Sequence, residues 1–322
     1  MLKKIVKKRM ILMAAVLFAV SLMYFLPKEK LYTLDSIKEE VTYVDEQVHK
    51  DVIYMLDKNN MLGRTEVVVN QTEIVNKAKE LLEILINDSK SEDKIPSGFK
   101  GILPSDTKIN SLTYDNKMIK VDFSKELLDI DQKYEQKMVE AIVYTLTSID
   151  EVEQIIIYVD GEILTTLPKT GIHLPSTLDK HYGINKSYDI TTYKNVNPVT
   201  IYYVNKYNDQ TYYIPVTKYV NDDREKIKII VEELASSATY NSNLMSYLNQ
   251  NTELLANKQE EDSLFLTFNQ YILNDMNERN ILEEVIYTIS LSVAANYDVK
   301  EVIFQVDDQE IYKSVIKTIE NS

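Results

Sequence analysis

An internal duplication constrains the fold of this chain more than any other feature, because residues 51–167 and 198–322 carry the same patterns in the same order. Each copy begins with two strand-like runs, continues with an amphipathic helix, a further strand and a second helix, and closes with a strand and a tight turn. Short motifs also correspond, since residues 121–124 (VDFS) match residues 266–269 (LTFN). The chain is therefore predicted to fold as two copies of one module.

The first copy contains two segments of helical periodicity among five strand-like runs. Asn70, followed by Glu73, resembles a capping box at the start of the first helix. Residues 115–117 and 160–161 are predicted tight turns. The strand-like runs are 51–56, 65–69, 108–114, 118–123 and 154–159. The apolar helix faces are Ile74, Ala78, Leu81, Leu82 and Leu85 in the first helix, and Met138, Ala141, Ile142, Thr145 and Ile149 in the second.

The second copy repeats this order without any glycine. Asp222 and Glu225 are predicted to cap its first helix, and residues 307–308 replace the closing turn. The strand-like runs are 199–204, 211–214, 263–268 and 302–306. The apolar helix faces are Ile227, Ile230, Val231 and Leu234, and then Leu282, Val285, Ile286, Ile289 and Val293. The pattern predicts an α+β fold in which each module has a small sheet, of about three strands, with two helices on one face.

The N-terminus carries a signal for membrane attachment. Residues 1–9 form a basic tail, and residues 10–26 are an uncharged run of 17 residues that spans about 25 Å as a helix. We interpret this run as a transmembrane anchor with a cytoplasmic N-terminus and extracytoplasmic modules. A cleaved signal peptide is the alternative, but bulky residues follow the apolar run where cleavage requires small ones. Residues 27–50 are expected to form a juxtamembrane stalk.

Charge and scarce residue types exclude several classes of function. The net charge is −14, yet residues 1–30 hold seven basic side chains and one acidic one. The other residues hold 29 basic and 49 acidic side chains, a net charge of −20 that disfavours nucleic acid as a partner. With no cysteine and no glycine-rich phosphate loop, disulfides, thiolate metal sites and the usual nucleotide cofactors are excluded. No cofactor is expected.

Few residues suggest catalysis. His173, Asp179 and His181 lie close together in the segment between the copies, but a solvated or capping role is favoured over a metal site. Asp122 and Ser124 resemble a nucleophile beside a carboxylate, and here Ser124 is predicted to cap a helix instead. We therefore expect a protein that is not an enzyme, with no catalytic, cofactor or metal residues.

Paired tyrosines on neighbouring strands are the candidate interface residues. Tyr202 and Tyr203 lie on one run of the second copy, and Tyr212 and Tyr213 lie on the next. Because adjacent strand residues point to opposite faces, one tyrosine of each pair is expected to face outward. Exposed tyrosine is favoured at protein interfaces, and an edge strand here can add to a partner's sheet. The alternative is that tyrosine simply suits strands.

Several motifs, in their order and spacing, resemble the GerM family of bacterial sporulation and spore-germination proteins with tandem GerMN domains. The motifs are residues 101–108 (GILPSDTK), 121–124 (VDFS), 142–147 (IVYTLT), 158–161 (YVDG), 169–173 (KTGIH), 181–185 (HYGIN) and 212–217 (YYIPVT). The resemblance identifies residues 51–167 and 198–322 as the two GerMN domains and residues 168–197 as a linker. Members often carry a lipid-attached cysteine, which this chain lacks.

The resemblance implies modules similar to the ring-building motifs of sporulation channel proteins. It also implies a non-catalytic role in scaffolding or localising the protein complex that bridges the mother-cell and forespore membranes. The expected partners are other envelope and sporulation channel proteins. The alternative is an extracytoplasmic module that senses peptidoglycan or a small ligand.

Overall fold

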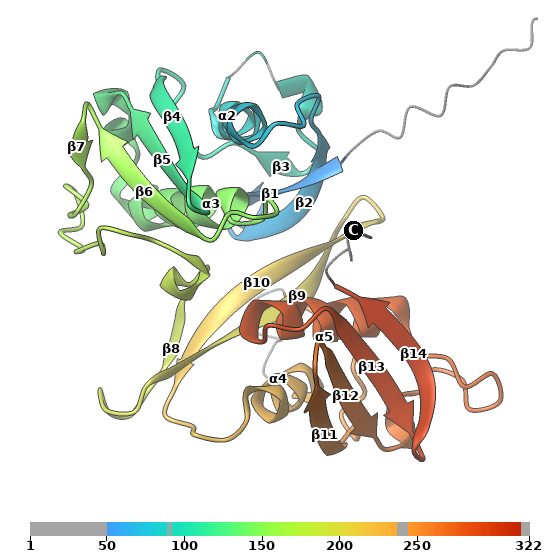
Figure 1. Cartoon of the computed structure of the whole chain (residues 1–322). Helices are drawn as coiled ribbons and strands as arrows, with labels where there is room; N and C mark the ends of the chain where they lie inside the picture. Colours follow the sequence, from blue (N-terminus) through green and yellow to red (C-terminus); the bar gives the residue numbers. More distant parts are fainter. Residues whose placement is uncertain (1–49, 89, 91, 237–243, 317–322) are drawn as a thin grey trace, which may run out of the picture. The chain divides into compact units, whose positions relative to one another are not determined.

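The structure, a computed structural model, describes residues 50–88, 90, 92–236 and 244–316, which belong to one compact unit of the chain (Figure 1). The predicted basic tail, the transmembrane anchor and all but the last residue of the predicted stalk lie outside these residues. Among the helices that the structure describes, none combines the length and the apolarity needed to cross a bilayer.

The first repeat contains the predicted strands and helices. Residues 154–159 form a strand with the predicted bounds, and the predicted pair of strands around residues 115–117 is confirmed. Its elements are β1 (Lys50–Asp57), β2 (Leu62–Val68), α2 (Ile74–Leu85), β3 (Phe99–Lys100), β4 (Ile109–Asp115), β5 (Met118–Phe123), α3 (Glu135–Leu146), β6 (Gln154–Val159) and β7 (Glu162–Ile163).

The second repeat has the same order except that it lacks a counterpart of β3 among the described residues, and it is preceded by β8 (Ser187–Asp189). Its first two strands are longer than the apolar runs that predicted them. Its elements are β9 (Asn197–Tyr207), β10 (Gln210–Val220), α4 (Lys226–Ala235), β11 (Leu254–Glu260), β12 (Ser263–Phe268), α5 (Glu283–Asn296), β13 (Glu301–Val306) and β14 (Gln309–Val315).

Each repeat has a four-stranded sheet of its own, in the order β4-β5-β6-β7 or β11-β12-β13-β14. The central pairs β5–β6 and β12–β13 are parallel. Parallel neighbours need a crossover connection, and α3 and α5 supply it. The expected number of about three strands is corrected to four, because the closing turns at residues 160–161 and 307–308 reverse the chain and add β7 and β14.

A third, six-stranded sheet joins the two repeats. Its order is β3-β1-β2-β10-β8, and β9 pairs with β10. β2 meets β10 through a single pair of residues, Arg64 and Tyr213. The prediction of one sheet for each module is therefore wrong, because the first two strands of each repeat pair with one another and belong to this shared sheet instead of the repeat's own four-stranded sheet.

Most residues of the predicted apolar helix faces are buried, whereas Ile74 and Leu282 are half-buried. Ala78, Leu81, Leu82 and Leu85 of α2 lie in the core of the first repeat, and α4 buries Ile227, Ile230, Val231 and Leu234. Ten of the twelve residues of α3 are buried. This helix shares a core with β5 and β6 and also contacts β1 of the shared sheet, so its polar residues enter the interior.

The predicted helix caps are corrected in both repeats. The cap of α2 is Glu73, whose carboxylate accepts a hydrogen bond from the backbone N–H of Asn76 (3.0 Å). The N–H of Asn70 instead donates to the Glu80 carboxylate. The capping box fails because the helix begins only at Ile74, the first residue of its apolar face. In α4, Asp222 binds Arg224 rather than the helix N-terminus. Glu225 does occupy the N-cap position of α4, but its side chain makes no capping hydrogen bond.

Candidate functional site

The predicted interface tyrosines lie mostly inside the molecule. Tyr202 and Tyr203 are each 4% exposed and Tyr212 is 6% exposed, while Tyr213 is half-buried. The expectation that one tyrosine of each pair faces outward is wrong for the first pair, because both faces of β9 are covered. Tyr203 packs in the core of the second repeat, whereas the Tyr202 hydroxyl shares a 2.7 Å hydrogen bond with that of Tyr54 on β1.

Tyr212 belongs to a buried polar contact centred on Asp57, the last residue of β1. The Asp57 carboxylate accepts hydrogen bonds from the Tyr212 hydroxyl (2.9 Å) and the Asn205 amide (3.2 Å), both in the second repeat. Its other oxygen accepts from the N–H groups of Asn59 and Met61, each at 2.8 Å. Sequence reasoning did not identify Asp57, because a single aspartate at a strand end is common in turns.

The segment between the repeats is fixed by a second buried residue, Asn185. Its side chain accepts from the N–H of Leu62 (3.0 Å) and donates to the carbonyls of Leu62 and Pro215, each at 2.8 Å. Its own N–H donates to the carboxylate of Glu140 on α3 (2.8 Å). Asn185 thus contacts β2, β10 and α3 at once, and it comes from the HYGIN motif of residues 181–185.

A cleft of about 510 Å³ opens beside Asn185. Four lysines and two glutamates contribute to its wall, together with apolar and aromatic side chains. One lysine, Lys218, forms an ion pair with Glu233. The charged residues are Lys133, Lys137, Glu140, Lys186, Lys218 and Glu233.

Glu140 and Lys186 both have strongly shifted pKa values in this cleft. Glu140 is only 2% exposed, and burial raises its pKa to about 7, although Lys186, the N–H of Asn185 and Lys137 oppose the rise. Burial also lowers the pKa of Lys186 to about 8 and that of Lys137 below its usual value, against the attraction of Glu140. Sequence reasoning missed these residues. The sequence signal that could have identified Glu140 is its position between Val139 and Ala141, in a helix that is apolar on most sides.

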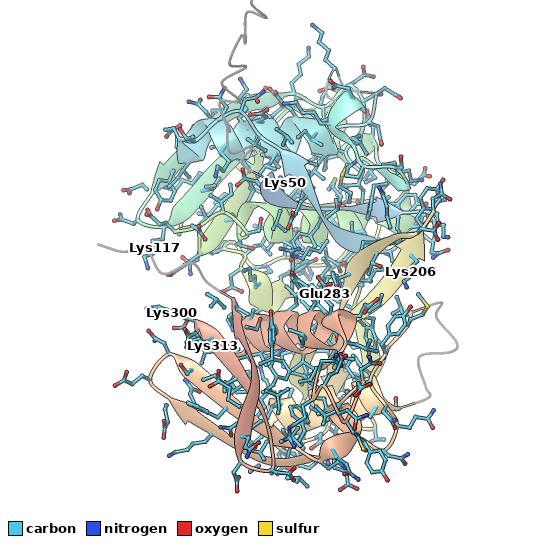
Figure 2. All side chains as sticks on the ribbon, turned by 90° about the vertical axis from the view of Figure 1, so that its right-hand side faces the viewer. Lys50, Lys117, Lys206, Glu283, Lys300 and Lys313 are labelled. Atoms are coloured by element: carbon cyan, nitrogen blue, oxygen red, sulfur yellow. The ribbon has the colours of Figure 1, made fainter. Side chains whose placement is uncertain are left out.

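A second groove, of about 440 Å³, contains Tyr213, the predicted interface residue of the second pair that is not fully buried. Its ring centroid lies 5.6 Å from that of Tyr287 on α5, which is 46% exposed. Glu283, labelled at the start of α5 in Figure 2, also lines this groove. The charged residues of the groove are Arg64, Glu66, Glu283 and Glu284. This groove is therefore an aromatic and acidic surface.

The other residues considered for chemistry have structural contacts. The Asp179 carboxylate accepts from the N–H of His181 (2.8 Å) at the start of a short 3-10 helix, and His173 contacts Thr166. In the part of the chain that the structure describes, no group of three or more His, Asp or Glu side chains is placed to hold a metal ion.

The suspected pair on β5 is likewise part of the fold. The Asp122 carboxylate accepts from the N–H of Gly161 in the closing turn (3.0 Å). Ser124 occupies a cap position of a 3-10 helix, but its hydroxyl makes no capping bond there and accepts from the N–H of Lys108 instead (3.0 Å). The predicted capping role is corrected, because the Ser124 side chain holds the start of β4.

The duplicated α+β repeat, joined by a shared sheet, defines a class of tandem-domain proteins. Residues 52–165 and 200–312 both match the Germane family, described as sporulation and spore germination. The chain belongs to this family. It is 29% identical over 261 residues to the spore germination protein GerM of Bacillus subtilis strain 168, a match that covers 79% of this chain and 70% of that protein.

A solved structure supports the same assignment. The tandem GerMN domains of the sporulation protein GerM from Bacillus subtilis superpose with a TM-score of 0.73 at 27% identity. The superposition covers 81% of this chain and 92% of that one. The predicted resemblance is therefore confirmed, and the fold is that of tandem GerMN domains. The names of these relatives describe sporulation and germination proteins rather than enzymes.

Proposed function

We propose that this chain is a non-catalytic, membrane-attached sporulation protein that scaffolds or localises a complex bridging the mother-cell and forespore membranes. The observation that carries the proposal is the buried joint between the repeats, formed by the shared sheet and by the Asp57, Tyr202 and Asn185 contacts. A joint of this kind holds two domains in one fixed arrangement, so that both can contribute to a single binding surface.

The groove around Tyr213 and Tyr287 supports binding of a protein segment. Tyrosine is enriched in protein interfaces, and three glutamates against one arginine favour a basic segment of the partner. On this proposal the partners are other envelope or sporulation channel proteins. The acidic character of the chain outside residues 1–30 would at the same time discourage nonspecific contact with anionic lipids and wall polymers.

The proposal is tested by the position of channel proteins in sporulating cells of the source bacterium. We expect fluorescently tagged channel proteins to lose their normal position when this chain is deleted. Reversal of charge in the groove (Glu283→Lys with Glu284→Lys) should reproduce that loss, whereas Glu310→Lys on the exposed strand β14 should not. Normal sporulation, normal germination and correctly placed channel proteins in the deletion strain would rule the role out.

Membrane attachment is a separate part of the proposal and rests on residues 1–26. We expect the full chain in the membrane fraction, with an intact mass that includes residues 10–26. A soluble mature form that lacks these residues would show that they are a cleaved signal peptide.

The alternative function, an extracytoplasmic sensor of peptidoglycan or a small ligand, is favoured by a different observation, the lysine-lined cleft. Titration of the protein with glycan fragments, followed by tyrosine fluorescence, tests the peptidoglycan form of this alternative.

A further inference from the structure

The cleft beside Asn185 is unusual within this acidic protein because its wall carries more positive than negative charges. Several surface lysines elsewhere pair closely with carboxylates: Lys117 with Glu153 (2.7 Å), Lys300 with Asp262 (2.7 Å) and Lys313 with Glu301 (2.8 Å). These three lysines are labelled in Figure 2.

Two cleft lysines lack such a pairing. For Lys137 and Lys186, no carboxylate oxygen of the described residues lies within 4 Å of the ammonium nitrogen. Lys137 contacts neutral acceptors, the carbonyl of Asn60 and the side-chain oxygen of Asn185 (3.5 Å). Lys186 lies over the ring of Tyr182, with its nitrogen 3.3 Å from the ring centroid. Both side chains are half-buried, and burial of a poorly compensated charge is costly.

Glu140 attracts both lysines, and Asp57 also attracts Lys137. The cleft lining as a whole holds four lysines and two glutamates, so it has two more positive than negative charges when both glutamates are ionised. A negatively charged ligand group would reduce this excess. The rest of the wall is suited to an apolar body, since it includes Met61, Tyr188, Tyr203, Val216 and Leu244.

We propose that this cleft binds a small monoanionic molecule whose carboxylate lies between Lys137 and Lys186 and whose apolar body contacts the aromatic wall. The volume of about 510 Å³ falls in the range of pockets that hold small ligands, roughly 300 to 1,000 Å³. The inference does not depend on the scaffolding role, because the cleft and the groove around Tyr213 have no lining residue in common.

A matched pair of probes tests the charge requirement directly. Benzoate and benzamide have nearly the same shape, but only benzoate carries a negative charge at neutral pH. Titration calorimetry on the full chain should show saturable binding of benzoate that is at least about tenfold tighter than binding of benzamide. Equal affinity for the two probes, or no saturable binding of benzoate, would overturn the proposal. If inorganic phosphate binds and benzoate does not, the proposed carboxylate ligand is wrong and the cleft binds a phosphate group instead.

The proposal predicts opposite changes in benzoate affinity for two variants, which separates an effect on binding from a merely structural effect. Lys186→Gln removes an attractive charge and should weaken benzoate binding at least about tenfold. Glu140→Gln removes the competing carboxylate and keeps an acceptor for the N–H of Asn185, so benzoate should bind more tightly. Lys117→Gln, which changes a lysine outside the cleft lining, is the control and should leave the affinity unchanged.

The outcomes remain decisive if one variant fails to fold. Thermal unfolding reports whether Lys186→Gln is folded, and Lys137→Gln provides a second test of the same attraction. If Glu140→Gln binds benzoate more weakly than the unchanged chain, the proposed placement of the carboxylate is wrong. If both lysine variants bind as well as the unchanged chain, the cleft is not the binding site.

Discussion

A few buried polar residues join elements that are far apart in the sequence. They are Asp57, Asn185 and the pair Tyr54 and Tyr202. In each case a buried polar group makes hydrogen bonds that join one repeat to the other, or that join the segment between the repeats to both of them. Buried polar groups cost stability unless they are satisfied, so such contacts specify one arrangement of the repeats rather than merely adding attraction.

The Tyr54–Tyr202 hydrogen bond gives the sharpest test of this idea. Tyr54→Phe or Tyr202→Phe should each lower the free energy of unfolding by about 1 to 2 kcal/mol, because each leaves one buried hydroxyl without its partner. The double variant should cost no more than either single one, since both partners are then apolar. A double-mutant cycle in urea measures the coupling. Fully additive losses would show that the two hydroxyls do not stabilise each other.

Glu140 predicts how stability depends on pH. Burial raises its pKa to about 7 from the ordinary value of 4.5, so the folded protein holds a proton that the unfolded chain releases between these values. The free energy of unfolding attributable to Glu140 therefore falls as pH rises from about 4.5 to 7, by up to about 3 kcal/mol.

Glu140→Gln removes this titration. Urea unfolding of the variant and the unchanged chain at pH 5 and pH 8 should show the variant gaining relative stability at the higher pH. Other carboxylates titrate in both proteins and cancel in the comparison. A difference between the two proteins that is the same at both pH values would contradict the raised pKa.

At the scale of elements, the tight turns show how two different sequences support one backbone. In the closing turn of the first repeat, between β6 and β7, Asp160 and Gly161 have positive φ of 47° and 83°, and in the closing turn of the second repeat, between β13 and β14, Asp307 and Asp308 have 54° and 57°. Two consecutive residues of this kind form the turn that matches the twist of a hairpin. The second repeat thus keeps its closing turn without glycine, because aspartate and asparagine tolerate this region better than most residues.

Glycine should nevertheless suit this turn better. Asp308→Gly is expected to raise the free energy of unfolding by about 0.5 to 1 kcal/mol, since relief of the left-handed strain exceeds the entropy that glycine adds to the unfolded chain. Chemical denaturation measures the change. Asp308→Ala is the matched comparison, and it should lower stability because alanine tolerates positive φ poorly. A glycine variant less stable than the alanine variant would contradict this account of the turn.

Local elements were predictable from the sequence, but their partners were not. Periodicity identified β6, β12 and the apolar faces of α2 and α4, because helix and strand repeats depend on near neighbours. Sheet membership depends on contacts between residues that are distant in the sequence. No local pattern within β2 or β10 indicates that these two strands meet at Arg64 and Tyr213. For the same reason alternation predicted that one of Tyr202 and Tyr203 faces outward, whereas the first repeat covers Tyr202.

The candidate cleft was even less visible in the sequence. Lys137 and Glu140 lie on α3, Lys186 follows the HYGIN motif, and Lys218 lies on β10. These charges are ordinary in composition, and only the fold brings them to one wall. The GerM family motifs identified the segment around Asn185 as characteristic, yet its role as a joint became evident only from its hydrogen bonds.

For the whole molecule, the shared sheet implies that the two repeats unfold together. Asn185 is central to this coupling because its side chain holds Leu62 of the first repeat and Pro215 of the second. Asn185→Gly keeps a residue that tolerates the positive φ of 45° at this position while it removes the side-chain bonds. We expect a loss of about 3 kcal/mol, because buried backbone groups of both repeats then lack a partner.

The matched control is Asn208→Gly, which also replaces an asparagine with φ of 45° but lies exposed in the turn between β9 and β10. Its stability should change by less than about 0.5 kcal/mol. Urea unfolding, monitored by hydrogen exchange, should show one cooperative transition for the unchanged chain and for Asn208→Gly. In Asn185→Gly the repeats should exchange with separate stabilities, because the joint that couples them is weakened. A single transition with unchanged midpoint in Asn185→Gly would mean that the remaining sheet contacts and the Asp57 cluster are sufficient to couple the repeats.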